Sequence, residues 1–224
     1  MKAGFGTNFH SIYRGEPRLY HAFSSAEFFS LALNRRLRET FTGNVLLDIA
    51  CGTCNKTILF SRYFKKVYAL DASYSLLSYG RELYGKNKKF EFLLASANHI
   101  PLLDNTVDTI VITWGSFPLS ESLREIKRVL KPGGVALRIG VWGKDEFTSL
   151  FPAFDMKRVK RIQKQFESAG FRKEKHLTTI SFKNLRDAKH ILRKVVGAKE
   201  EDIKIKTLHH WVVLHYFRKP YGRL

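Results

Sequence analysis

The stretch that decides the fold is VLLDIACGTCN, which runs from Val45 to Asn55. An apolar run contains Asp48 near its end, and a short loop of small residues follows over 50–54. In open α/β sheets, ligands bind at the carboxyl ends of strands, where small residues let a ligand approach the backbone. A helix that begins there offers free N–H groups. We therefore predict a strand, a ligand-binding loop and a helix.

Apolar runs of strand length continue from this stretch and alternate with helical patterns. The predicted strands are 45–50, 67–71, 90–95, 108–113 and 135–141, and the predicted helices are 56–64, 74–84 and 122–130. Nearly continuous apolar strands are typical of a parallel sheet that is covered by helices on both faces. The helix over 122–130 is expected to begin at a capping box formed by Ser122 and Glu125.

The flanking regions extend the same pattern. The spacing of apolar residues predicts helices over 25–40, 155–169 and 184–196 and strands over 176–182 and 211–217. The predicted fold is therefore a doubly wound α/β domain with a seven-stranded, mostly parallel sheet. We expect one domain over 1–224, with a helical cap (1–44), a ligand-binding core (45–141) and a basic part that completes the sheet (142–224).

The loop at 50–54 resembles motif I of the class I (Rossmann-like) S-adenosylmethionine-dependent methyltransferases, and of their type 11-like members in particular. That motif is usually an acidic residue followed by G-x-G-x-G, and its three glycine positions here hold Ala50, Gly52 and Cys54. Three further landmarks follow in the family's order. Asp71 ends the predicted second strand, residues 95–108 are similar to the exit of the third strand and the lead into the fourth, and the LKPGG turn occupies 130–134.

The resemblance implies S-adenosylmethionine as the cofactor, with Asp71 on the ribose hydroxyls and Ser96 where the family often has an aspartate near the adenine. The expected cofactor-binding residues are Asp48, Ala50, Cys51, Gly52, Asp71, Ala72, Ser96, Ala97 and Thr113. The residues expected to face the substrate are Trp114, Ser116 and Phe117, after the fourth strand, and Tyr13 from the aromatic N-terminal region. No residue is identified as a catalytic base.

Other readings of the same residues are less favoured. Nicotinamide-binding domains use G-x-G-x-x-G, which is absent from this loop. Cys51 and Cys54 form a C-x-x-C pattern that also suits redox chemistry, and zinc would need two further ligands. We assign His209, His210 and His215 to the surface or the core, and we expect no bound metal.

Composition limits the partners. The chain of 224 residues has a net charge of +19, and residues 151–224 alone carry 19 basic and 7 acidic groups. Such a charge attracts polyanions such as RNA.

No apolar run approaches the ~20 residues of a membrane-spanning helix. Two cysteines argue against a disulfide framework and favour a cytoplasmic location. Oligomeric state is not indicated.

The sequence is therefore compatible with three functional hypotheses. The first is methyl transfer to a small-molecule acceptor, which the short chain favours. The second is methylation of tRNA or rRNA, in which the basic C-terminal third would bind the nucleic acid. The N/D-P-P-Y/F signature of amino-methylating enzymes and a cysteine suited to cytosine-C5 chemistry are both missing after the fourth strand. The third is a non-catalytic protein that binds a nucleoside or RNA on an altered methyltransferase fold.

Overall fold

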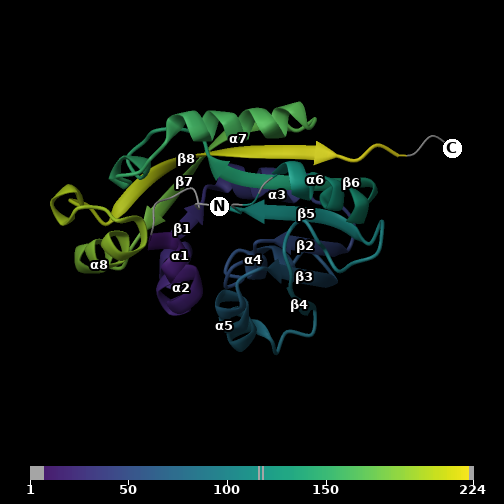
Figure 1. The fold of residues 1–224 in the computed structure, drawn as a ribbon, viewed down its shortest axis with the longest axis horizontal. Coiled ribbons are helices and arrows are strands. Elements are labelled where there is room, and N and C mark those ends of the chain that lie inside the picture. The colour runs from purple at the N-terminus through teal and green to yellow at the C-terminus, as the bar shows by residue number, and fades with distance from the viewer. Residues whose placement is uncertain (1–7, 116, 118, 222–224) are drawn as a thin grey trace.

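The computed structural model describes residues 8–115, 117 and 119–221. Among these, eight strands form one sheet in the order β1-β7-β8-β6-β5-β2-β3-β4 (Figure 1). The strands are β1 (Glu27–Phe29), β2 (Val45–Ile49), β3 (Lys66–Asp71), β4 (Phe90–Leu94), β5 (Val107–Thr113), β6 (Leu130–Val141), β7 (Arg172–Ser181) and β8 (Thr207–Arg218). The α-helices are α1 (Asn8–Gly15), α2 (Pro17–Ser25), α3 (Leu31–Thr40), α4 (Thr57–Ser61), α5 (Tyr74–Tyr84), α6 (Leu119–Val129), α7 (Met156–Ser168) and α8 (Leu185–Val196).

The sheet confirms the doubly wound α/β class. β4, β3, β2, β5 and β6 run parallel, whereas β8, β7 and β1 pair antiparallel at the other side. From β2 the chain winds outward through β3 and β4, and it then returns to β5 on the other side of β2. The carboxyl ends of β2 and β5 therefore meet at a topological switch point, where ligands bind in this architecture.

Helices cover both faces of the parallel strands. On one face Leu47 and Ile110 pack in the same cluster as Ile126 of α6 and Phe166 of α7. On the other face Leu46 and Val111 pack with Leu33 and Leu37 of α3 and with Phe60 of α4. Strands buried on both sides have no polar face, which explains their continuous apolar character.

The N-terminal helices lie at the antiparallel side of the molecule. α1 and α2 contact α8, the helix between β7 and β8, and Figure 1 shows these three helices grouped beside β7. Ile12 of α1, Leu192 of α8 and Phe151 of the loop after β6 are buried in one apolar cluster there. In the described part of the chain, no helix combines the length and apolar character needed to cross a membrane.

The expected strand count and the expected first helix were wrong in the same place. Residues 25–40 contain the edge strand β1 and then α3, whose first turn is capped because the Ser30 hydroxyl accepts a hydrogen bond from Leu33 N–H. Glu27–Phe29 pairs with 178–180 of β7. A strand of three residues is too short to show a period of its own, and its partner lies 150 residues away in sequence, so its pattern merges with the helix that follows.

Two further boundaries differ from expectation around α6. This helix begins at Leu119, which places Ser122 inside it, and the Glu125 carboxylate binds Arg128 and accepts a hydrogen bond from Ile100 N–H instead of forming a capping box. The strand that follows begins already at Leu130, because the turn is absorbed as an irregularity in the pairing of β5 with β6. Contacts from other elements decide both boundaries, so the local motif did not predict them.

Candidate functional site

A cleft of about 570 Å³ opens at the carboxyl ends of β2, β3, β4 and β5. Its size lies within the ~300–1,000 Å³ of small-molecule sites. The lining comes from α1, α2, the loop after β2, the start of α5 and the ends of β4 and β5. It comprises Tyr13, Arg14, Tyr20, Ile49, Ala50, Leu70, Asp71, Ala72, Ser73, Tyr74, Ser75, Leu76, Ala95, Ser96, Ala97, Thr113, Trp114, Gly115 and Phe117.

The loop after β2 keeps a glycine-like path although two of its three glycine positions hold other residues. Ala50, Gly52 and Cys54 have φ values of 60°, 57° and 62°, all in the left-handed region. A residue with a Cβ costs about 1–2 kcal/mol in this conformation. The surrounding structure therefore holds the loop in a path that glycine would adopt freely, and Ala50 lines the cleft.

Asp71, at the end of β3, is the acidic residue of the cleft wall. Its Oδ2 accepts a hydrogen bond from Gly52 N–H at 2.7 Å, and its Oδ1 accepts one from Ser73 N–H at 2.8 Å. Burial raises the pKa of this carboxyl group, while the N–H donors of Ser73, Gly52 and Ala72 oppose the rise. The side chain links the first loop to the start of α5 and presents a fixed carboxylate to the cleft.

Three of the predicted cofactor-binding residues lie behind this wall. Asp48 is buried and accepts a hydrogen bond from the Thr57 hydroxyl at 2.6 Å, and burial raises its pKa to about 7. Cys51 is also buried. Gly52 is covered by Tyr20, since a Cβ at this position would lie 2.8 Å from the Tyr20 ring. These residues shape the loop from within.

The other predicted cofactor-binding residues line the cleft itself: Ala72, Ala97, Ser96 and Thr113. The Ser96 hydroxyl donates a hydrogen bond to the Asn98 side chain. Thr113 ends β5 and is 9% exposed, and its Oγ1 has no hydrogen-bond partner among the described residues. The end of β5 therefore holds a buried hydroxyl without a described hydrogen-bond partner, on a residue that lines the cleft.

Of the residues predicted to face the substrate, Tyr13, Trp114 and Phe117 line the cleft, and Ser116 lies outside the described residues. Trp114 also has a positive φ of 60°, which is unusual for a bulky residue. Backbone strain of this kind is found at sites where the surrounding structure holds a side chain in one position.

The α2 helix supplies residues that sequence reasoning missed. His21 Nδ1 lies 2.8 Å from the Thr53 hydroxyl, and Tyr20 lines the cleft above Gly52. Lys56 donates hydrogen bonds to the backbone carbonyls of Ser24 and Glu27, at 3.2 and 2.5 Å. The aromatic density of the N-terminal region was a signal for this cover, but it did not single out Tyr20.

A second, smaller pocket adjoins the cleft. It has a volume of about 70 Å³ and shares Tyr13, Tyr20 and Trp114 with the cleft. The rest of its lining is Phe23, Ser24, Glu27, Val141, Phe147, Thr148, Phe151 and Ile180. We call it the acceptor-side pocket. Glu27 was missed because it lies in the segment that was expected to be helical.

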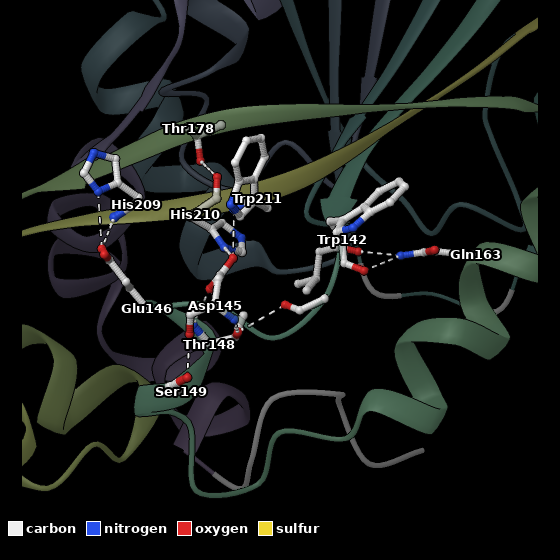
Figure 2. A network of polar contacts seen from close by, with 12 residues as sticks. Trp142, Asp145, Glu146, Thr148, Ser149, Gln163, Thr178, His209, His210 and Trp211 are labelled. Carbon is white, nitrogen blue, oxygen red and sulfur yellow. Dashed lines mark hydrogen bonds and ion pairs between the residues drawn. The ribbon is translucent and has the colours of Figure 1, made fainter.

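The loop after β6, residues 142–155, forms one wall of this pocket and is fixed to β8. Figure 2 shows Asp145 and Glu146 pointing from the loop toward His210 and His209 of β8. Oδ2 of Asp145 lies 2.7 Å from His210 Nδ1 and also accepts a hydrogen bond from Trp211 N–H at 2.8 Å. Burial disfavours the charge on Asp145, but the bonds from His210, Thr148 and Trp211 outweigh it and lower the pKa.

The geometry of Cys51 and Cys54 does not favour redox chemistry or metal binding. Both are buried and free, with their sulfur atoms 3.6 Å apart, and burial raises the pKa of Cys51. A raised pKa disfavours the thiolate that redox or metal chemistry uses. Within the described residues, no three histidine, cysteine, aspartate or glutamate side chains are grouped as metal ligands would be.

Comparison with known proteins shows that the chain is similar to methyltransferases. Residues 47–137 match the model of a methyltransferase domain. A malonyl-[acyl-carrier protein] O-methyltransferase of Yersinia pestis is 35% identical over 106 residues, which cover 46% of this chain and 38% of that protein. The ubiquinone/menaquinone biosynthesis C-methyltransferase UbiE of Cronobacter sakazakii is 37% identical over 122 residues, which cover 50% of this chain and 48% of that protein. These matches span less than half of either relative.

Solved structures share the fold over most of the chain. A SAM-dependent methyltransferase from Aquifex aeolicus superimposes with a TM-score of 0.56 at 22% identity, covering 89% of this chain and 99% of that one. The YcgJ protein from Bacillus subtilis gives a TM-score of 0.59 at 18% identity, covering 89% and 99%. Residues 47–137 make up less than half of the chain, so the structural agreement extends well beyond them.

Proposed function

We propose that the chain, whose residues 47–137 match a methyltransferase domain, is a class I S-adenosylmethionine-dependent methyltransferase that transfers a methyl group to a small-molecule acceptor. The observation that carries this proposal is the position of Asp71, whose carboxylate stands on the wall of a cleft at the switch point of the sheet. A fixed carboxylate can accept two hydrogen bonds from the vicinal hydroxyls of a ribose. The related proteins are named for methyl transfer as well.

The residues present fit such a cofactor. Ala72, Ala97 and Ser96 line the end of the cleft at β3 and β4, where they would border the adenine, with Asp71 at the ribose. Asp48, Cys51 and Gly52 would act from behind, by holding the loop that Ala50 presents to the ligand. Thr113 and Trp114, at the end of β5, would lie toward the methyl group.

Methyl transfer from a sulfonium requires the protein mainly to position the two reactants. Bound S-adenosylmethionine supplies a methyl group on an activated sulfonium leaving group. The protein must align the acceptor with that methyl group and exclude water. Tyr13, Tyr20, Trp114 and Phe117 surround the cleft with aromatic surface, which excludes water and favours a cation on its ring faces.

We further propose that residues 1–224 act as a single domain, in which 1–44 cover the site and 142–224 complete the sheet. The position of the covering helices is evidence for a small acceptor molecule. Tyr13 and Tyr20 stand between the cleft and the acceptor-side pocket and line both. A large polymer would need these helices to open. The relative named for ubiquinone and menaquinone biosynthesis agrees with a small acceptor.

Methylation of RNA is the second candidate, and α7 is the observation that favours it. Lys157, Lys160, Arg161 and Lys164 are exposed on this one helix. A surface of this kind binds phosphates, with an affinity that falls steeply as salt rises. Tight binding of tRNA at low salt that disappears at about 200 mM salt would favour this candidate over a small acceptor.

The test is calorimetric titration with S-adenosylmethionine, S-adenosylhomocysteine and NAD in separate experiments. We expect micromolar binding of the first two and none of NAD. Absence of binding to both methionine nucleosides would overturn the proposal and would favour the non-catalytic reading of the altered glycine loop. Binding of NAD alone would assign the cleft to a dinucleotide instead.

A further inference from the structure

The acceptor-side pocket has apolar walls and a single carboxylate. Phe23, Val141, Phe147, Phe151 and Ile180 form most of its surface, and Glu27 reaches it from β1. Its volume of about 70 Å³ is less than half of the roughly 150 Å³ of an apolar cavity that admits benzene. A ring-sized ligand would therefore place one end here and extend past Trp114 into the cleft.

Glu27 is nine-tenths buried, and its two carboxylate oxygens differ. Oε2 accepts a hydrogen bond from the Trp114 indole N–H at 2.8 Å and lies 3.6 Å from Lys56 Nζ. Oε1 has no hydrogen-bond partner among the described residues, although Glu27 is only 8% exposed. Buried polar atoms are nearly always satisfied, so an orphaned carboxylate oxygen on a side chain that lines a pocket indicates a missing donor.

The charge of Glu27 is already balanced. Lys56 is 6% exposed and sits against the same carboxylate, and its ammonium also donates to the Glu27 backbone carbonyl. Burial of Lys56 lowers its pKa, while Glu27 opposes that change. A second cation at Oε1 would leave an uncompensated positive charge among apolar walls, whereas a neutral O–H donor would leave none.

We infer that the acceptor-side pocket binds the methyl acceptor, and that Oε1 of Glu27 accepts a hydrogen bond from a neutral hydroxyl group on an otherwise apolar molecule. This inference rests on the proposed function and names its substrate class. Trp114 joins the two sites, since it lines both and donates to Glu27. His210 stacks on Trp114 with the ring centroids 5.3 Å apart, which holds the indole in place.

The experiment compares phenol with toluene, which has the same ring and a methyl group in place of the hydroxyl. Both are titrated into the full chain, with and without S-adenosylhomocysteine, and the indole N–H resonance of Trp114 is followed by NMR. The indole N–H of Trp114 donates a hydrogen bond to Glu27, so its resonance reports directly on changes at the carboxylate. We expect phenol to shift it saturably and to bind about tenfold more tightly than toluene, as for a hydrogen bond to a charged group.

Glu27→Gln should reduce the preference for phenol over toluene to about twofold or less, because the acceptor is no longer charged. Glu146→Gln is the matched control, since it removes a carboxylate from the same wall loop at an exposed position that pairs with His209. Equal affinities of phenol and toluene for the unmodified chain, or an unchanged preference in Glu27→Gln, would overturn the inference.

Lys56→Met provides a test that does not need Glu27 to be changed. Without the Lys56 cation, Glu27 should favour a charged donor. The affinity for benzylammonium relative to that for phenol should therefore rise by about tenfold or more in this variant. Binding of S-adenosylhomocysteine separates the two proposals. If it binds but phenol shows no preference, only the acceptor inference fails. If it does not bind, the methyltransferase proposal fails, and the phenol titration of the unliganded chain still decides the role of Glu27.

Discussion

Oδ2 of Asp145 lies 2.7 Å from Nδ1 of His210, so the loop after β6 is tied to a strand 65 residues further along the chain. Both side chains are buried, with exposures of 6% and 0%. Oδ1 of the same carboxylate accepts from Thr148 N–H at 2.9 Å, within the wall of the acceptor-side pocket. One carboxylate therefore orders the loop internally and also holds it against β8.

Replacement of this carboxylate should cost stability. We expect Asp145→Ala to lower the free energy of unfolding by about 2–4 kcal/mol, because it leaves several buried donors without an acceptor. Glu146→Ala is the control, since its pair with His209 is about half exposed and should contribute less than about 1 kcal/mol. Urea denaturation measures both. Similar losses in the two variants would contradict the role assigned to Asp145.

Asp71→Ala should weaken binding of S-adenosylhomocysteine by about 1–3 kcal/mol, the usual cost of leaving buried polar groups unpaired. We expect the loss to have two sources, the proposed ribose contact and the N–H groups of Gly52 and Ser73 that Asp71 holds. Calorimetry measures the dissociation constant. Asp104→Ala removes an exposed carboxylate paired with Arg128 and should leave it unchanged. An unchanged constant for Asp71→Ala would remove this residue from the site.

Gly52→Ala should destabilise the protein by about 1–3 kcal/mol, because its φ of +57° is strained for alanine and the new methyl group would meet Tyr20. The displaced Tyr20 ring should also loosen α2 over the cleft. Gly15→Ala is the control, since nothing lies within 4 Å of the added Cβ. Thermal unfolding compares the two. Equal melting temperatures would mean that Tyr20 does not rest on this loop.

Asp48 should make stability depend on pH. Burial raises its pKa to about 7 in the folded state, from 3.8 in an unperturbed aspartate. The folded chain therefore binds the proton more tightly than the unfolded chain does between these values. Its contribution to stability is fully present below about pH 4, falls as the pH rises, and is lost above about pH 7, by at most about 1.4 kcal/mol per pH unit.

Asp48→Asn removes this titration and keeps an acceptor for the Thr57 hydroxyl. The variant should gain stability relative to the unmodified chain as the pH rises from 5 to 7, and the difference should level off by pH 8. Urea denaturation of both proteins at pH 5, 6, 7 and 8 measures the difference. Parallel pH profiles would show that Asp48 does not carry a raised pKa.

Local patterns predicted the cofactor core well. The helix expected over 74–84 has those bounds in the structure as Tyr74–Tyr84, because its hydrophobic period and the Ser73 cap are both local. The strands from β2 to β5 agree within one residue at either end. Asp71 at a strand end and the loop of small residues were visible for the same reason. Whether Ala50, Gly52 and Cys54 would share a left-handed path was not visible, because the packing around the loop imposes it.

The sequence by itself determined the doubly wound class, the succession of strands and helices along the central part of the chain, and the acids in β2 and β3, since each depends on residues that are neighbours along the chain. Only the tertiary structure decided that Glu27 belongs to an edge strand and meets Trp114 and Lys56, which lie 87 and 29 residues away. No periodicity encodes such a meeting. It follows from the pairing of β1 with β7 and from the packing of α2 on the first loop, which are contacts between segments far apart in the chain.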